Sequence, residues 1–306
     1  MRRFFYATNS NISNDVTNEN ENEKAATYPQ LSTLPIGASV ELTESIVHHW
    51  CRVLRANIGD KGILFDGFGG EYQVQLQTIS KKHATATLLA HVDTDRNAAV
   101  LTKIGLVISR GERMDYAIQK STELGVTAIQ LLSSHHGEVN LKPAQVEKKL
   151  AQWQQVAIAA CEQCGLNRPP LIIAPLSIDD WLLNVAANEK ANEKEMVVSP
   201  MVAELSKDAY YQALQRPADL RLQLSVPAAG QPLMPEALPV VLKQHAPYIE
   251  LLIGPEGGLS ADECAKAADV GFAPWQIGPR VLRTETAPVV ALATLSALAT
   301  MHALNQ

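Results

Sequence analysis

The stretch YIELLIGPEGGLSADECAKAADVGFAPWQIGPRVLRTETAP, residues 248–288, decides the fold of this chain. Residues 248–253 are mostly apolar and short enough to form a buried strand. The strand ends at the glycine-rich run 254–258, and a helix follows, marked by Ser260 as N-cap with Glu263 three residues later. A strand, a glycine-rich loop and a helix in this order are typical of ligand sites at the carboxyl end of a parallel sheet. The stretch therefore predicts an α/β fold with a pocket at that edge.

The same phrase occurs twice. Ile253-Gly254-Pro255 is echoed by Ile277-Gly278-Pro279, again after a short apolar segment and again before a helix. The second loop, 278–286, carries two arginines, a carboxylate and two hydroxyls. Two adjacent strand ends with two such loops would build one pocket. The duplication favours a ligand site, although a pair of structural turns is the alternative reading.

The phrases LLIGPEGGLS and GPRVLRTETA resemble the cofactor-binding loops of the SPOUT methyltransferases, and within them the RsmE family. The segments SRGERMDYAIQKSTELGV and CEQCG also resemble that family, but Leu166 stands where the family commonly has arginine. The resemblance implies a trefoil-knotted parallel sheet, S-adenosylmethionine as cofactor, and methylation of N3 of a uridine in 16S ribosomal RNA of the small subunit. It also implies a homodimer.

Length and composition suit a two-domain globular protein. The chain has 306 residues, of which 46% are hydrophobic, enough for about two domains with substantial cores. The net charge of −6 argues mildly against a nucleic-acid binder, because attraction to phosphates requires clustered Lys and Arg. Part of that charge lies in segment 9–27, whose Asn- and Glu-rich composition predicts a mobile insertion.

The termini predict a cytoplasmic protein that makes no membrane contact. MRRFFYATNS lacks the long apolar core of a signal peptide, and the four cysteines do not form a secreted disulfide framework. Residues 287–304 include no Asp, Glu, Lys or Arg, but their many Ala and Thr residues make them weakly hydrophobic for a membrane helix. We expect this segment to be a buried or dimer-forming helix.

The domain boundaries follow from a change of pattern near residue 95. Residues 1–95 contain short strand-like segments separated by turn residues, which predicts a small β-barrel, PUA-like by the resemblance. Residues 98–306 alternate strands and helices and form the expected SPOUT methyltransferase domain. Within them, residues 187–220 are an expected insertion.

An RNA-binding role is expected for three arginines, Arg52, Arg55 and Arg110. Arg52 and Arg55 lie in a helical segment that resembles the family's PUA-like domain, where they would hold phosphates. Without the resemblance, a solvated helix end explains them equally well.

The resemblance also assigns the cofactor site. The residues expected to bind S-adenosylmethionine come from both glycine-rich loops: Leu252, Ile253, Gly254, Glu256, Gly257, Gly258, Ile277, Gly278, Leu282 and Thr284. Ser225 and Pro227 are added from a third loop, which follows the strand-like segment 222–225. No P-loop and no GxGxxG motif is present, so a nucleoside triphosphate or a dinucleotide is less favoured.

Catalysis at uridine N3 requires loss of a proton, and a nearby cation would stabilise the resulting anion. Arg283 is the first candidate for that cation and Arg280 the second. Glu285 is either the base or a holder of an arginine, and helix capping before Pro288 is its structural alternative.

No metal site is expected. Cys161 and Cys164 form a single CxxC without a second pair of ligands, so two small residues on one helix is the favoured interpretation. Two other functions remain open from the residues alone: a phosphate-ester hydrolase that uses the glycine loops as an anion nest, and a non-catalytic RNA-binding assembly factor.

Overall fold

The structure is a computed structural model that describes residues 1–8, 28–188, 196–226 and 234–304. The chain divides into two compact units. The N-terminal unit comprises Met1–Arg96 and Cys161–Arg168, and the C-terminal unit comprises Asn97–Ala160 and Pro169–Gln306. The predicted insertion 9–27 lies outside the described residues.

The N-terminal unit is built on one five-stranded sheet. Its strands are β1 (Arg2–Phe5), β2 (Ser39–Glu41), β3 (Lys61–Phe65), β4 (Glu71–Ile79) and β5 (Ala84–Val92). The order is β1-β3-β4-β5-β2, with β1 parallel to β3 and the other pairs antiparallel. Among the described residues β1 and β2 are the two edges. The strands of the predicted small β-barrel thus pair into this one sheet.

A short helical segment covers the core of this unit. It consists of α1 (Glu44–Ile46) and a π-helix, Val47–Val53. Trp50 is buried, stacks on Phe4 with ring centroids 4.9 Å apart, and lies where a Cβ on Gly62 would be 2.8 Å from its ring. The indole thus packs directly on β3 because residue 62 has no side chain.

The segment 161–168 belongs to this unit through hydrogen bonds of its side chains. The Glu162 carboxylate accepts a hydrogen bond of 2.9 Å from the backbone N–H of Phe5. Arg168 donates to the Asp95 carboxylate at 2.7 Å and to the carbonyl of Phe68 at 2.8 Å. The CEQCG phrase and the Asn-Arg pair after it therefore anchor the end of α3 (Pro143–Cys164) in the N-terminal unit.

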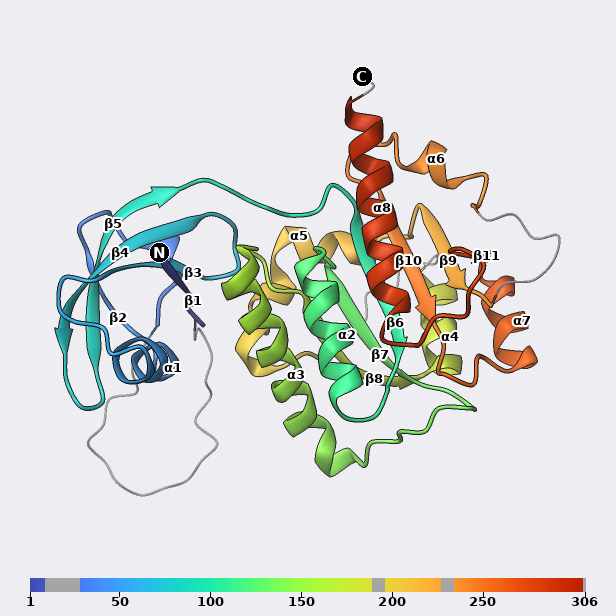
Figure 1. The fold of residues 1–306 in the computed structure, drawn as a ribbon, viewed down its shortest axis with the longest axis horizontal. Helices are drawn as coiled ribbons and strands as arrows, with labels where there is room; N and C mark the ends of the chain where they lie inside the picture. Colours follow the sequence, from blue (N-terminus) through green and yellow to red (C-terminus); the bar gives the residue numbers. More distant parts are fainter. Residues whose placement is uncertain (9–27, 189–195, 227–233, 305–306) are drawn as a thin grey trace. The chain divides into compact units, whose positions relative to one another are not determined.

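The C-terminal unit contains a six-stranded sheet in which every neighbouring pair is parallel (Figure 1). Its strands are β6 (Leu101–Val107), β7 (Ala128–Ser133), β8 (Leu171–Ser177), β9 (Leu220–Leu224), β10 (Tyr248–Ile253) and β11 (Phe272–Trp275). The order is β11-β9-β10-β6-β7-β8. The predicted α/β fold with a parallel sheet is confirmed. One detail is wrong: β10 and β11 are not adjacent, because β9 lies between them.

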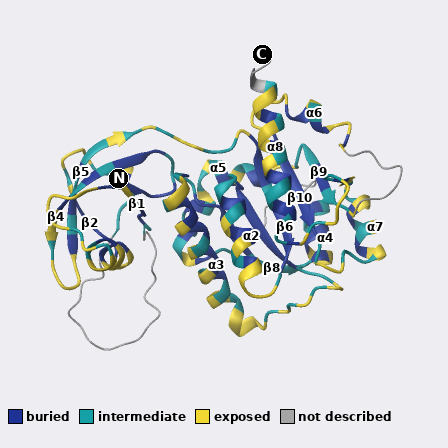
Figure 2. Cartoon of the chain, viewed as in Figure 1, coloured by how far each residue is buried: buried dark blue, intermediate teal, exposed yellow. Residues whose placement is uncertain are grey.

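Helices cover both faces of this sheet (Figure 1). They are α2 (Glu112–Glu123), α3, α4 (Ile178–Asn188), α5 (Ala209–Gln212), α6 (Leu238–Val241), α7 (Ala261–Asp269) and α8 (Ala287–Leu304). One core joins the sheet to α2, α3, α6 and α8, and a second joins it to α4 and α7. Figure 2 accordingly shows the strands buried and the outer faces of the helices exposed.

Side chains of β10 alternate between the two cores. Ile249, Leu251 and Ile253 enter the first core, whereas Leu252 enters the second. All six residues of β10 are buried, as expected for a central parallel strand covered on both faces. In the second core a Cβ on Gly105 would lie 2.6 Å from the Trp181 ring, so only glycine lets α4 pack this closely on β6.

Residues 196–220, which the sequence suggested as part of an insertion, pack against the C-terminal unit. They form 3₁₀ turns at Pro200–Val202, Leu205–Lys207 and Ala213–Gln215, and the short helix α5. Tyr211 is fully buried, and its hydroxyl donates to the carbonyl of Pro169 at 2.7 Å.

The uncharged final segment forms α8, whose Ala291, Leu292 and Leu295 are buried in the first core. Within the described part of the chain, no helix has the length and apolar character needed to cross a membrane.

A buried charge cluster joins three strands of the sheet. Glu250 on β10 pairs in register with Lys103 on β6 and with Arg221 on β9. Its carboxylate lies 3.5 Å from the Lys103 ammonium and accepts hydrogen bonds from Arg221 at 3.2 Å and from the Tyr248 hydroxyl at 2.8 Å. Glu250 is only 5% exposed. Burial, and next the neighbouring Glu250 charge, raise the pKa of Tyr248 well above its usual value, so its hydroxyl remains a donor.

We expect Glu250→Gln to lower the free energy of unfolding by about 3 kcal/mol, because buried Arg221 and half-buried Lys103 lose their counter-charge. Urea unfolding would measure the change. The matched control is Glu256→Gln, which removes a carboxylate from the ion pair with Arg113. The Glu256 side chain is 44% exposed, so this variant should lose less than about 1 kcal/mol of unfolding free energy. Equal losses in the two variants would contradict the importance of the cluster.

Candidate functional site

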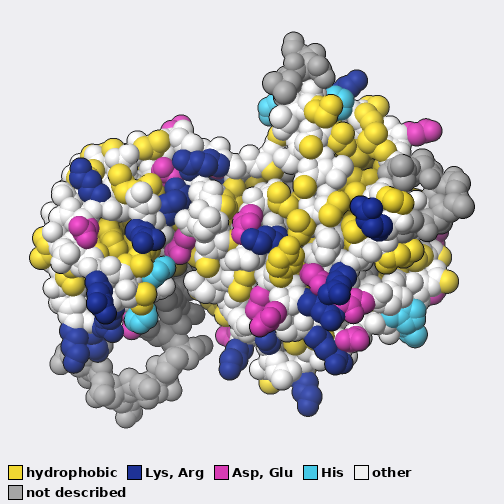
Figure 3. All heavy atoms as spheres, in the orientation of Figure 1, with side chains coloured by type: hydrophobic (Ala, Val, Ile, Leu, Met, Phe, Trp, Pro, Cys, Tyr) yellow, Lys and Arg dark blue, Asp and Glu magenta, His cyan; other side chains and the backbone are white. Residues whose placement is uncertain are grey.

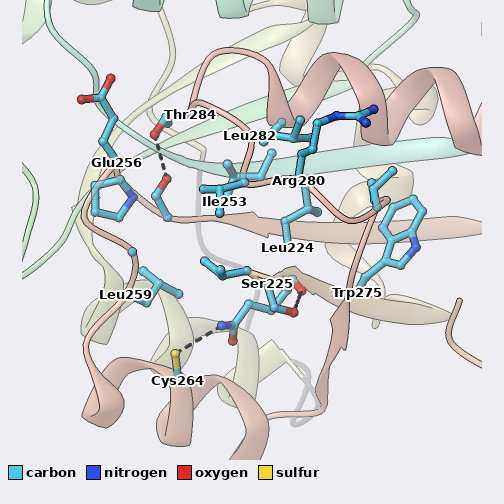
Figure 4. A pocket seen from close by; sticks show the side chains of 18 residues that line it. Leu224, Ser225, Ile253, Glu256, Leu259, Cys264, Trp275, Arg280, Leu282 and Thr284 are labelled. Atoms are coloured by element: carbon cyan, nitrogen blue, oxygen red, sulfur yellow. Dashed lines mark hydrogen bonds between the residues drawn. The ribbon is translucent and has the colours of Figure 1, made fainter. Parts of the chain in front are cut away.

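A pocket of about 290 Å³ lies at the carboxyl ends of β9, β10 and β11. Three loops form it: the residues after β9, the run 254–259 after β10, and the segment 276–286 between β11 and α8. Figure 4 shows Ile253, Leu282, Leu224 and Ser225 around one space, with the charged ends of Glu256 and Arg280 pointing outward on opposite sides of it. The strand order reverses beside this pocket, between β6 and β10, because β7 and β8 are added on one side of β6 and the later strands on the other. Such switch points are where open α/β sheets bind ligands.

The loop after β10 contains a backbone conformation that favours glycine at residue 258. Gly258 adopts φ +72° and lines the pocket, and a Cβ at this position would meet no atom within 4 Å. Its backbone N–H donates to the carbonyl of Pro255 at 2.9 Å, which closes a turn. The predicted capping box is confirmed, with Ser260 and Glu263 bonding each other's backbone N–H groups.

Side chains from other segments hold this loop. The Thr284 hydroxyl, 4% exposed as a residue, donates to the carbonyl of Gly254 at 3.3 Å and so joins the two glycine loops (Figure 4). Arg113, at the start of α2, pairs with the Glu256 carboxylate. Arg113 was not singled out from the sequence, because nothing in its local pattern shows that α2 begins beside the loop.

The structure brings most of the predicted cofactor residues together. Eight of them line the pocket: Ser225, Ile253, Gly254, Glu256, Gly258, Ile277, Leu282 and Thr284. Leu252 instead packs into the core beneath α4 and α7, and a Cβ on Gly257 would point at His136, 3.4 Å away. Gly278, with φ +79°, belongs to the loop but is not among the residues that line the pocket. Pro227 lies outside the described residues.

Several lining residues were missed in the sequence: Gln223, Leu224, Val226, Pro255, Leu259, Cys264, Trp275, Val281 and Ala287. They include apolar residues at strand ends and one residue of α7. The Gln223 amide donates to the Cys264 sulfur at 3.3 Å, which forms a polar patch on one wall (Figure 4). Pro255, Leu259, Val281 and Ala287 lie within the two loop phrases, which were the available signal for them, whereas Gln223, Cys264 and Trp275 gave no local signal.

The three candidate catalytic residues occupy different environments. Arg280 lines the pocket. The Arg283 side chain is 76% exposed and lies 4.0 Å from the Glu285 carboxylate, and neither of these two residues is among those that line the pocket. The Glu285 side chain is 12% exposed, and its Oε2 is buried without a hydrogen-bond partner in the part of the chain that the structure describes.

The predicted RNA-binding arginines lie in both units. Arg52 and Lys82 line a hollow of about 380 Å³ in the N-terminal unit, together with His48 and His49. Figure 3 shows Lys and Arg side chains gathered at the lower left of this unit, where the β4–β5 hairpin ends in Figure 1. Arg110 belongs to the C-terminal unit and pairs with Glu138 at 3.1 Å.

No group of three or more His, Cys, Asp or Glu side chains among the described residues is arranged to hold a metal ion. Cys161 is fully buried, and this burial raises the pKa of its thiol well above the usual value. Because the thiolate is the metal ligand and the nucleophile, Cys161 acts here as a small apolar residue.

Comparisons with known proteins agree with this geometry. A family model described as an RNA methyltransferase domain matches residues 96–296, and one described as an RNA methyltransferase PUA domain matches residues 42–89. The ribosomal RNA small subunit methyltransferase E of Synechocystis is 32% identical over 86% of this chain and 74% of its own length. The protein of the same name from Buchnera aphidicola is 28% identical over 84% of this chain and 87% of its own length.

Solved structures show the same fold. A ribosomal RNA small subunit methyltransferase E from Neisseria gonorrhoeae, bound to S-adenosyl methionine, is 28% identical and covers 97% of this chain and 98% of its own, with a TM-score of 0.70. A methyltransferase from Legionella pneumophila in complex with the same cofactor is 30% identical, with a TM-score of 0.68, over 86% of this chain and 93% of its own.

The fold, the pocket and these matches define an RNA methyltransferase with a PUA domain. More specifically, the chain belongs to the ribosomal RNA small subunit methyltransferase E family. The family predicted from the two loop phrases is confirmed, and the hydrolase alternative loses its support.

We expect Gly258→Val to abolish calorimetric binding of S-adenosylhomocysteine, because the added side chain occupies the loop surface that lines the pocket. Gly37→Val is the control for the strain that a β-branched residue causes at positive φ. Gly37 has φ +92°, and a Cβ there would also meet nothing within 4 Å. Gly37→Val should bind normally. Wild-type affinity in a folded Gly258→Val protein would show that the pocket is assigned wrongly.

Proposed function

We propose that this protein transfers a methyl group from S-adenosylmethionine to N3 of a uridine in 16S ribosomal RNA of the small subunit, in the cytoplasm. The observation that carries the proposal is the pocket formed by the three strand ends, with Arg280 on its wall, in a chain of this family. Relatives named ribosomal RNA small subunit methyltransferase E support the substrate.

The residues of the pocket suit this cofactor. Ile253, Leu282 and Trp275 offer apolar walls for an adenine ring, and the loop 254–258 offers backbone groups for the polar edges. Glu256 is the lining carboxylate, and its pairing with Arg113 holds the loop in place. Bound S-adenosylmethionine would supply an electrophilic methyl group on a sulfonium, and the protein's part is to hold it in line with the base.

The arginines would handle charge on the uridine. Uridine N3 attacks only after losing its proton, so negative charge develops on the base. Arg280 is placed to stabilise that charge, because it lines the pocket. Arg280 and Arg283 are both exposed, but Arg283 does not line the pocket and is therefore better placed to contact the RNA chain, which reverses the order that the sequence suggested. Glu285 is a candidate base or a holder of Arg283, and its unpartnered Oε2 is compatible with either.

The direct test uses labelled S-adenosylmethionine and small ribosomal subunits that lack the modification, with mass spectrometry to map the methyl group. We expect one methyl on N3 of one uridine of 16S RNA. A methyl group at another atom would contradict the proposed specificity. No transfer by a protein that binds both ligands would favour the assembly-factor alternative.

A single-turnover assay should distinguish the role of Arg280 from that of Arg283. We expect Arg280→Ala to lower the rate at saturating RNA by about 10²–10³-fold while RNA binding changes little. Arg280→Lys should recover part of the rate, because it keeps the charge but not the planar fork. Arg283→Ala should weaken RNA binding and leave the saturated rate close to wild type. The opposite outcome would restore Arg283 as the catalytic arginine.

An RNA-binding role for the N-terminal unit is supported by the backbone at Arg55. This residue follows the C-cap of the π-helix and adopts φ 54°, a conformation that usually belongs to glycine at the end of a helix. A strained non-glycine residue indicates a side chain that is needed for another purpose. We propose that Arg55, Arg52 and Lys82 contact RNA phosphates.

We expect Arg55→Gly to leave stability unchanged or to raise it by about 0.5–1 kcal/mol, because the strain is relieved, while affinity for the small subunit falls and depends less on salt. Ala246→Gly is the matched control, since Ala246 has φ 48°. It should be similarly stable and bind RNA normally. Unchanged affinity and salt dependence in Arg55→Gly would remove Arg55 from the RNA surface.

We further propose that the segments around the pocket form a trefoil knot and that the protein is a homodimer. The strand order supports the knot, since β10 lies between β6 and β9 although it follows β9 in the chain. The outer face of α8 supports the dimer, because four of its exposed residues, Ala293, Ser296, Ala297 and Thr300, are small and allow close helix packing, and the fifth, Met301, offers apolar surface.

A further inference from the structure

The loop between β7 and α3 lies beside the cofactor loop, although the two are far apart in the chain (Figure 1). Two consecutive histidines in it make the contacts. His136 Nδ1 lies 3.1 Å from the carbonyl oxygen of Gly258. The backbone N–H of His135 donates to the Glu263 carboxylate at 2.8 Å.

Glu263 holds the β7–α3 loop in place. It is 6% exposed, and its second carboxylate oxygen accepts the backbone N–H of Ser260 at 2.7 Å. Burial alone would raise the pKa of Glu263, but hydrogen bonds from the backbone of His135 and Ser260 outweigh it and lower the pKa. The carboxylate is therefore charged at neutral pH and ties the β7–α3 loop to the start of α7.

His136 is held in contact with the pocket loop as a result. Its Cβ lies 3.4 Å from the position that a Cβ on Gly257 would take, so the histidine packs directly against the backbone of the glycine-rich loop. The ring then reaches the carbonyl of Gly258, the residue with φ +72° on the pocket wall. Because a carbonyl oxygen only accepts, Nδ1 carries the hydrogen and donates it.

We propose that His136 is a positioning residue for the cofactor: its Nδ1–H fixes the Gly258 peptide, and thereby the backbone surface of the loop 254–258, in the binding-competent conformation. It acts through the loop, because it does not line the pocket itself. A hydrogen bond of this kind contributes modestly in an exposed setting, but it spares the ligand the entropy cost of ordering a glycine-rich loop. This inference rests on the proposed assignment of the pocket to S-adenosylmethionine.

The test is calorimetric titration of S-adenosylhomocysteine into wild-type protein and three full-length variants. His136→Ala should weaken binding by about 3- to 10-fold. His136→Asn should stay within about twofold of wild type, because its amide N–H can donate over a similar reach. His135→Ala, the matched control, should bind normally, since its backbone N–H still donates to Glu263.

Methylation kinetics provide the second readout. His136→Ala should raise KM for S-adenosylmethionine by the same factor and leave kcat unchanged, since only the held conformation of the free loop is lost. Wild-type affinity in His136→Ala, an equal loss in His135→Ala, or failure of His136→Asn to recover binding would each overturn the inference. If wild-type protein does not bind S-adenosylhomocysteine, the pocket assignment fails, and the inference with it.

Discussion

The position of β10 between β6 and β9 is the constraint on which the site depends. β10 is buried along its whole length, and its parallel registers with β6 and β9 set where the neighbouring strands end. Leu252 pairs with Gln223 on β9, and Gln223 pairs in turn with Pro274 on β11. The three strands therefore finish at one level, and three loops distant in sequence meet there. Proline is tolerated in β11 because this strand is an edge of the sheet.

The charge cluster around Glu250 bears on that register. Burial of a carboxylate and two cations has a large desolvation cost, so such a cluster is weak evidence for stability. Its geometric effect is clearer. A slip of β10 by one residue would turn Glu250 into the aliphatic core shared with α2, α3 and α8, away from Lys103 and Arg221. The cluster thus penalises the wrong alignment of the strand that carries the glycine-rich loop 254–258.

The pocket combines a glycine-rich loop with side chains from other segments that hold the loop in place. A glycine-rich segment lets a ligand approach the backbone but has many conformations available when free. Thr284 and Arg113 reach it from separate segments, and the capping box of α7 closes its far end. The N-terminal unit shows the opposite case at Arg55, where a side chain occupies a backbone conformation better suited to glycine. In both places the backbone geometry indicates where ligands are expected.

The sequence by itself determined the order and type of the main elements, the capping box at Ser260 and the family, because periodicity, capping and an unbroken loop phrase are local properties of the chain. It did not reveal that β9 separates β10 from β11, in what order the N-terminal strands pair, or that Gln223, Cys264 and Trp275 complete the pocket. Nor did it show that Gly257 faces His136 while Gly258 lines the pocket. These facts depend on which strands pair and in what register. Pairing between distant segments is selected by burial of the whole sheet, so only the tertiary structure decides it.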